Sequence, residues 1–295
     1  MKKPGYFVSF VTFIAVLVLF LIIIYHLFFL REKDFVFEKD IDTRKQLAKY
    51  GFCICKNVIS NEDADALKTQ SIEKNYKSVK TFLLENPHMT NMIHDVTGSP
   101  DYIFQDYVWI IQKSAVHTCH RDNNGNFFNK GQQHASYTAL VYLEEMSKCL
   151  AVIPKSHTDV NSYFVDLKHS LQNVLCNKGD VIIFNANLIH VGTLNDKPDN
   201  LRVQLKITHK DDIQYIHYYQ NFNKILNKEN TNPVYLQKIQ RHISCMFPGF
   251  SNLTQNENIS SSRGTDNGAV VGYPQQVFSY LFYGNKNFYN LPNAF

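Results

Sequence analysis

His120 and Asp122 stand two residues apart, and a second histidine, His190, follows much later in the chain. On an extended strand, residues i and i+2 point to the same side, so His120 and Asp122 can reach one ion together. Two imidazoles and one carboxylate around a single metal form the facial triad of non-haem Fe(II) oxygenases, which leaves positions open for a co-substrate and O2. An HxD pair alone is common by chance. If all three residues bind one metal, the chain must fold so that two distant segments meet.

The segment around His190 has the pattern of strands closed by an arginine. A Gly-Asp turn precedes the apolar run 181–184, which is typical of a buried strand. After His190, a polar turn at 195–200 leads to Arg202 and a strand over 203–208. Such a hairpin brings the Arg202 guanidinium back beside His190, and this planar fork suits a carboxylate held by two hydrogen bonds. The sequence therefore predicts a 2-oxoglutarate site with Arg202 as its carboxylate clamp.

Four ordered motifs make the chain resemble the phytanoyl-CoA dioxygenase-like branch of the 2-oxoglutarate/Fe(II) oxygenases. They cover about residues 46–209 and are the opening strand at 49–60, the His120-Asp122 pair, the turn at 151–157 and the closing strands at 179–202. The resemblance implies an α+β fold, in which N-terminal helices pack on a double-stranded β-helix (jelly-roll, cupin-like) core with iron at its mouth.

The resemblance also implies the chemistry. Fe(II) is held by His120, Asp122 and His190, 2-oxoglutarate chelates it, and O2 takes the remaining position. Decarboxylation then yields succinate and CO2 while the substrate is oxidised. Gln112 and Thr193 are predicted to be further polar contacts to 2-oxoglutarate. Because related halogenases have a small residue in place of Asp122 to make room for halide, we expect hydroxylation of a small-molecule or lipid-like substrate.

The chain departs from the family pattern at three places. Lys155 stands where the family usually has Gly, and 146–149 replaces a common Asn-Gly pair. The interval from His190 to Arg202 is one residue longer than in typical members. None of these changes removes a metal ligand, so they bear on substrate and activity more than on fold.

Several alternatives stay open at this point. His117 could replace His120, although only His120 has a carboxylate two residues on. Tyr137 and Thr138 face opposite sides of one strand, so at most one of them faces the site. A catalytically silent relative would use the jelly-roll as a membrane-tethered binding module and consume no 2-oxoglutarate. A structural protein of the envelope type, with coincidental motifs, would bind no iron tightly.

The N-terminus carries an apolar run at residues 6–30, in which Ser9, Thr12 and His26 are the only clearly polar members. As a helix this run reaches about 37 Å, more than the roughly 30 Å hydrocarbon core of a bilayer. A cleaved signal peptide is the alternative, but its apolar stretch is ~7–15 residues long and ends at a small-residue cleavage site. The sequence therefore predicts a single-pass membrane anchor.

The orientation of this anchor follows from a slight charge bias. Two lysines and the terminal amine precede the span, whereas Arg31 and Lys33 follow it closely. The bias leans towards a cytoplasmic N-terminus with the catalytic domain luminal or extracellular. Asn252 and Asn258 fit the N-glycosylation pattern, which has meaning only in that orientation.

Helical patterns precede strand patterns along the chain, which favours one α+β domain with a β-rich core. Helices are expected from Ser60, a capping residue with Asp63 three residues on, towards Leu84 and again over 90–96, and strands are expected from Tyr102 onward. The tail after about Ile243 is rich in Asn, Ser and aromatic residues and either packs on the barrel or is loosely ordered. The predicted units are the anchor at 1–30, a linker at 31–45, the oxygenase domain at 46–243 and a C-terminal extension at 244–295.

Composition narrows the function further. The net charge of +4 is mild, and the helix-spaced Lys74, Lys77 and Lys80 are typical of a solvated face, so we expect no nucleic-acid partner. No zinc-type Cys pairing or phosphate-binding Gly loop competes with the iron interpretation. All six cysteines are taken as reduced by default, and Cys119 is expected to face away from the iron.

Overall fold

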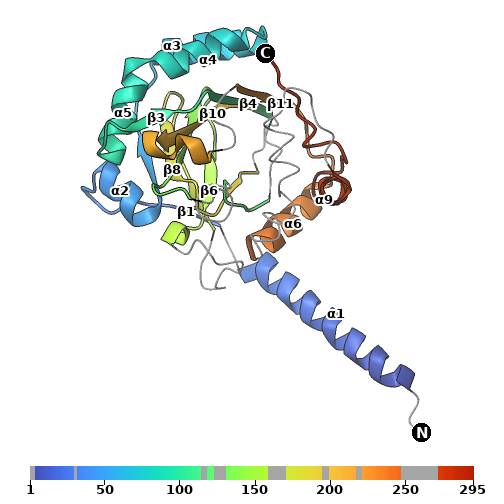
Figure 1. The fold of residues 1–295 in the computed structure, drawn as a ribbon. Helices are drawn as coiled ribbons and strands as arrows, with labels where there is room; N and C mark the ends of the chain where they lie inside the picture. Colours follow the sequence, from blue (N-terminus) through green and yellow to red (C-terminus); the bar gives the residue numbers. More distant parts are fainter. Residues whose placement is uncertain are drawn as a thin grey trace.

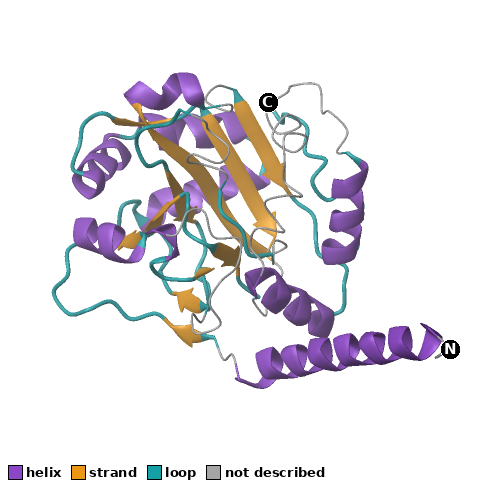
Figure 2. Cartoon of the chain, turned by 60° about the horizontal axis from the view of Figure 1, so that its bottom comes forward, coloured by secondary structure: helices purple, strands orange, loops and turns teal. Residues whose placement is uncertain are grey.

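Two facing β-sheets form the core of the chain (Figures 1 and 2). The computed structural model describes residues 4–29, 32–113, 118–122, 131–158, 171–194, 199–216, 221–246 and 272–295. The larger sheet has the strand order β11-β4-β10-β5-β8-β2, with β3 paired to one end of β10. The smaller sheet has the order β1-β7-β6-β9. The strands are β1 (Lys33–Asp34), β2 (Phe52–Cys55), β3 (Tyr102–Phe104), β4 (Tyr107–Lys113), β5 (Tyr137–Tyr142), β6 (Leu150–Val152), β7 (Gln172–Val174), β8 (Val181–Asn185), β9 (His190–Gly192), β10 (Asp199–His209) and β11 (Phe222–Leu226).

Helices precede most of the strands, as the sequence predicted. Three of them, all within residues 61–97, cover the outer face of the larger sheet (Figure 1). The α-helices are α1 (Pro4–Phe29), α2 (Thr43–Tyr50), α3 (Asn61–Ile72), α4 (Tyr76–Glu85), α5 (Pro87–Thr97), α6 (Val234–Met246) and α9 (Tyr273–Tyr283), and the 3-10 helices are η1 (Ser156–Thr158) and η2 (Lys210–Tyr215). This order of elements and the two facing sheets confirm the α+β prediction.

Helix ends follow local capping chemistry. The Ser60 hydroxyl accepts a hydrogen bond from the Asp63 backbone N–H at 3.0 Å, which is the N-cap half of the capping box predicted for the start of α3, and it donates to the Asp63 carboxylate at 2.8 Å. Helix α2 ends at Gly51, where φ is +83°. A side chain there would be strained by the left-handed backbone and would collide with the His157 ring, so glycine is required.

The alternation of β10 separates the helix-facing core from the space between the sheets. Its odd-numbered residues in the middle of the strand are apolar and pack with α4 and α5; they are Leu201, Val203, Leu205 and Ile207. Because side chains alternate along a strand, the even-numbered residues point to the other face. These are Asn200, Arg202, Gln204, Lys206 and Thr208, all buried. One strand therefore presents a row of polar side chains to the interior.

The space between the sheets is filled by a second apolar cluster. It includes Phe52, Tyr142 and Phe184 from the larger sheet and Leu150 and Val152 from the smaller one. Contacts from both sheets within one cluster show that their inner faces pack on each other. The predicted linker contributes to this packing as well, because β1 pairs in parallel with β7.

The apolar N-terminal run forms α1, but the predicted membrane span is not supported. Among the residues that the structure describes, no helix is both long and apolar enough to cross a bilayer.

A disulfide joins Cys119 to Cys245 on α6, so the expectation that every cysteine is reduced is wrong for this pair. The backbone N–H of Cys119 also donates to the Ser244 hydroxyl at 2.9 Å. The other four cysteines are buried free thiols, namely Cys53, Cys55, Cys149 and Cys176. Helix α6 is therefore bound covalently to the residue that precedes His120.

The described part of the C-terminal extension, residues 272–295, packs against the larger sheet. Phe278, Tyr283 and Phe288 are buried in one cluster with Tyr107 and Trp109 of β4. Packing, rather than loose order, is thus the correct alternative for this part. Helix α6 also runs through the boundary predicted at 243. The predicted glycosylation sites at Asn252 and Asn258 lie outside the described residues.

Candidate metal centre

His120 and His190 face each other across a two-residue antiparallel bridge. The backbone N–H of each donates to the carbonyl of the other at 3.0 Å. The Asp122 Oδ1 atom lies 3.5 Å from His120 Nε2 and 3.4 Å from His190 Nε2. The structure thus brings the three predicted ligands together, with one potential ligand atom from each within 4.8 Å of the others.

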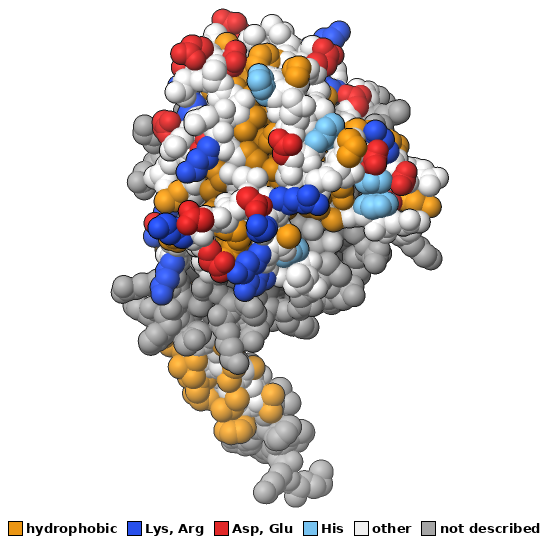
Figure 3. Space-filling model, turned by 90° about the vertical axis from the view of Figure 1, so that its left-hand side faces the viewer, with side chains coloured by type: hydrophobic (Ala, Val, Ile, Leu, Met, Phe, Trp, Pro, Cys, Tyr) orange, Lys and Arg blue, Asp and Glu red, His pale blue; other side chains and the backbone are white. Residues whose placement is uncertain are grey.

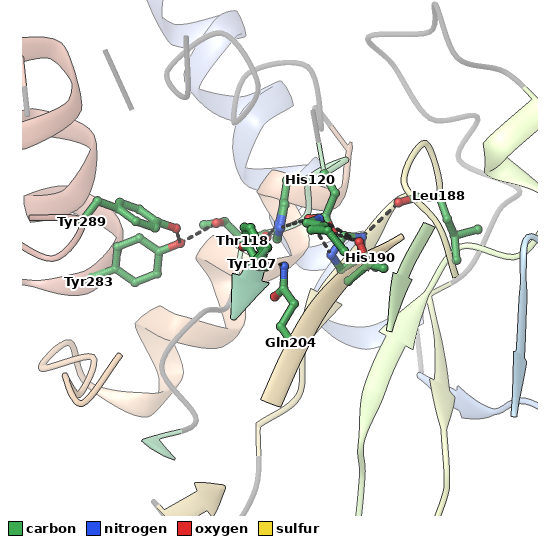
Figure 4. A network of polar contacts seen from close by, with 11 residues as sticks. Tyr107, Thr118, His120, Leu188, His190, Gln204, Tyr283 and Tyr289 are labelled. Atoms are coloured by element: carbon green, nitrogen blue, oxygen red, sulfur yellow. Dashed lines mark hydrogen bonds and ion pairs between the residues drawn. The ribbon is translucent and has the colours of Figure 1, made fainter. Parts of the chain in front are cut away.

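Both histidines are oriented by backbone carbonyl groups. His120 Nδ1 lies 2.8 Å from the Thr118 carbonyl oxygen, and His190 Nδ1 lies 3.0 Å from that of Leu188 (Figure 4). A carbonyl oxygen only accepts, so each Nδ1 carries the proton and each Nε2 turns its lone pair towards the Asp122 carboxylate. Metal-binding histidines commonly show this arrangement. Burial and the neighbouring His190 lower the pKa of His120, which keeps its imidazole in the neutral, metal-binding form.

The second oxygen of Asp122 is held by two residues from the larger sheet. Asp122 Oδ2 accepts hydrogen bonds from Lys206 Nζ and from the Thr138 hydroxyl, each at 2.6 Å. Burial alone raises the pKa of Asp122, but the Lys206 ammonium beside it outweighs burial and holds that pKa well below its usual range. The carboxylate is therefore ionised and fixed, with Oδ1 directed between the two Nε2 atoms.

Lys206 is a site residue that the sequence analysis missed, and Thr138 is the member of the Tyr137-Thr138 pair that faces the site. The sequence contains one signal that could have identified Lys206. It lies four residues after Arg202, so the period of two places both on the same face of β10. Tyr137 instead contacts the Tyr102 ring at a centroid distance of 5.4 Å.

Arg202 lies in the interior between the sheets, with 5% of its surface exposed. Its Nη1 donates to the Asn200 carbonyl oxygen at 3.1 Å, and no carboxylate within the described part of the chain forms an ion pair with it. Burial lowers the pKa of this guanidinium. The planar fork of this guanidinium can bind a carboxylate through two hydrogen bonds.

The structure does not bring Gln112 to this site. Along β4, Val108 and Ile110 belong to the helix-facing core, and Gln112 shares their face. Its carboxamide donates to the Ser71 carbonyl oxygen of α3 at 3.5 Å. Gln112 also lines an outer cleft of about 460 Å³. The predicted contact to 2-oxoglutarate therefore has no support in the structure.

Thr193 lies just beyond β9, and its hydroxyl donates to the Lys148 carbonyl oxygen at 2.9 Å. This bond ties the end of β9 to the loop before β6. A different polar pair lies in the interior, where the Gln204 amide is 3.5 Å from the Tyr107 hydroxyl (Figure 4).

The C-terminal extension reaches the same centre. The Tyr283 hydroxyl lies 2.5 Å from the Thr118 hydroxyl and 2.9 Å from that of Tyr289 (Figure 4). The carbonyl of Thr118 in turn orients His120. A chain of hydrogen bonds therefore runs from two tyrosines of the extension to one potential metal ligand.

Comparison with known proteins identifies one matching protein family. The model of the phytanoyl-CoA dioxygenase (PhyH) family matches residues 54–199 of the chain, a range that contains His120, Asp122 and His190 and ends before Arg202. No curated protein matches the chain.

Several solved structures show a distant similarity. The epimerase SnoN in complex with Fe3+, alpha ketoglutarate and nogalamycin RO is 12% identical, with a TM-score of 0.47 and coverage of 57% of this chain and 82% of that one. HygX from Streptomyces hygroscopicus with nickel and 2-oxoglutarate bound is 16% identical, with a TM-score of 0.45 and coverage of 57% and 87%. EvdO2 from Micromonospora carbonacea var. aurantiaca is 14% identical, with a TM-score of 0.44 and coverage of 61% and 94%.

Proposed function

Because the chain belongs to the phytanoyl-CoA dioxygenase family of Fe(II)- and 2-oxoglutarate-dependent oxygenases, we propose that it hydroxylates a small-molecule substrate with release of succinate and CO2. The observation that carries this proposal is the convergence of two Nε2 atoms and one carboxylate oxygen, each already oriented by its own hydrogen bonds.

Each residue of the centre has a part in this reaction. His120, His190 and Asp122 Oδ1 hold Fe(II), which supplies the activation of O2 coupled to decarboxylation of 2-oxoglutarate. Lys206 and Thr138 bind the second Asp122 oxygen and keep the carboxylate in one orientation. Arg202 binds the distal carboxylate of 2-oxoglutarate through its planar fork. Because a carboxylate occupies the position that halogenases leave open for halide, hydroxylation is favoured.

A catalytically silent binding module is the second candidate. Such a protein would keep the fold and the buried Arg202 and still form no succinate. The orientation of the two triad histidines argues against this candidate, because both imidazoles have Nε2 turned towards Asp122. A silent relative has no need for that alignment.

The proposal is tested with the full chain, purified without oxygen and mixed with Fe(II) and 2-oxoglutarate. We expect the weak visible metal-to-ligand band of the chelate, and we expect its loss in His190→Ala. His88→Ala is the matched control, because His88 is an exposed histidine on α5, away from the centre. A folded wild-type protein without the band would favour the silent module, and a band of full strength in His190→Ala would remove His190 from the ligand set.

We also propose that the domain works in an oxidising compartment, as the predicted luminal or extracellular location requires. The Cys119–Cys245 disulfide supports this, because structural disulfides persist in secreted proteins and are rare in the cytosol. Peptide mapping of protein alkylated before lysis should recover Cys119 linked to Cys245. Cys245→Ser should lower the stability of the domain by about 2–5 kcal/mol in chemical unfolding. Recovery of both cysteines as alkylated thiols would contradict the proposal.

A further inference from the structure

A second group of potential metal ligands lies outside the triad. His134 precedes β5, His209 ends β10, and Asp211 lies in η2. One potential ligand atom from each residue lies within 4.8 Å of the others. The two imidazole rings stack with centroids 3.7 Å apart and planes inclined by 15°. Figure 3 shows histidine and acidic side chains interspersed with basic and apolar ones on one face of the molecule.

Asp212 orients His134 within this group. The Asp212 carboxylate is 1% exposed and accepts backbone N–H bonds from Gln133 at 2.8 Å and from His134 at 2.7 Å. Its Oδ2 atom also lies 3.2 Å from His134 Nδ1. A carboxylate that accepts from Nδ1 leaves the Nε2 lone pair of His134 free for another partner. Carboxylate–histidine pairs of this kind support the ligands of many metal sites.

The other two residues provide a partly closed site with access to water. The His209 side chain is 11% exposed, and the Tyr102 ring contacts it edge-on at a centroid distance of 5.2 Å. Asp211 is 72% exposed, and its Oδ2 atom lies 3.5 Å from His209 Nδ1. Coordination of one cation by all three residues requires the two imidazoles to leave their stack, because the lone pairs of parallel rings do not converge on one point. The ligand atoms then lie about 2.1 Å from the metal.

We propose that His134, His209 and Asp211 bind one divalent cation of the zinc type, with Asp212 as the orienting carboxylate. Two imidazole nitrogens and one carboxylate oxygen form a donor set that Zn2+ prefers, and water completes the tetrahedron on the exposed side. The cation joins the loop before β5 to the end of β10. These are the strands that carry Thr138 and Lys206, so the site braces the sheet that holds Asp122.

The test is zinc binding measured by calorimetry on the full chain in a His190→Ala background, where the triad is incomplete. We expect one Zn2+ per chain in His190→Ala. In His190→Ala/His209→Ala we expect zinc affinity to fall at least 100-fold, and in His190→Ala/Asp211→Asn about 10-fold. Asp211→Asn changes an exposed side chain, so it keeps the test valid where the histidine variant fails to fold. His190→Ala/His88→Ala is the matched control and should bind as His190→Ala does.

Equal zinc binding with and without His209 and the Asp211 carboxylate would overturn the proposal, as would the lack of micromolar binding in a folded His190→Ala protein. Zinc should also raise the unfolding temperature of His190→Ala and leave that of the His209→Ala double variant unchanged. The oxygenase proposal fails or holds separately, because its test uses Fe(II), 2-oxoglutarate and the intact triad.

Discussion

Asp122→Ala is expected to abolish succinate formation and to lower Fe(II) affinity by more than about 100-fold. The substitution removes the only carboxylate of the triad, and outer partners of metal ligands alone are worth ~10–100-fold in affinity. It also leaves the Lys206 ammonium, 10% exposed, without its ion-pair partner beside two histidines. That cation repels a metal, and the loss of its buried ion pair lowers stability by about 3–5 kcal/mol. Anaerobic Fe(II) titration, succinate assays and chemical unfolding measure the three effects.

Asp122→Ala/Lys206→Met separates the two causes. Methionine retains much of the length of lysine without the charge, so we expect the double variant to regain stability and to remain inactive. Full turnover in either variant would refute the assignment of Asp122 as a ligand. If the free energy of unfolding stays low in the double variant, the loss of the Asp122–Lys206 ion pair is not the cause of the lower stability.

Arg202→Met is expected to raise the KM for 2-oxoglutarate by about 30-fold or more, which corresponds to the ~2–5 kcal/mol lost when one partner of a buried charge pair is truncated. At saturating 2-oxoglutarate, kcat should fall much less, because the lost contact is made in the ground state as well as during the reaction. Steady-state kinetics with 2-oxoglutarate as the varied substrate measure both quantities.

Arg202→Lys tests the geometry of this contact. Lysine keeps the positive charge but lacks the planar fork, so we expect a KM between those of the wild type and Arg202→Met. Arg44→Met is the matched control, because Arg44 is an exposed arginine of α2. An unchanged KM in Arg202→Met would show that 2-oxoglutarate binds elsewhere or that the chain does not use it.

The pairing of His120 with Asp122 could be predicted because its basis is local, whereas the family resemblance implied that His190 meets them. The period of two along a strand places the first two side chains together, and the strand pattern before His190 marks the third. The roles of Thr138 and Lys206 depend on the pairing of β5 with β10, in which Lys206 stands opposite Thr138. That register is set by tertiary packing between segments far apart in sequence, so no local pattern reveals it.

The position of Gln112 could not be predicted for a different reason. Strand β4 is apolar on both faces, since Val108 and Ile110 face the helices while Tyr107, Trp109 and Ile111 pack with the C-terminal extension. A strand buried on both sides lacks the alternation that tells inner from outer positions. The disulfide was equally hidden, because its cysteines are 126 residues apart and pairing cannot be deduced from spacing.

The Cys119–Cys245 bond has a consequence for how the centre assembles. The covalent ring that it closes contains His120, Asp122, His190 and Arg202. In the oxidised, unfolded chain these residues already belong to one loop, so the search that brings them together starts from a restricted ensemble. Refolding from the reduced state begins without that restriction. The bond that anchors α6 in the folded protein thus also reduces the conformational search that brings the metal ligands together.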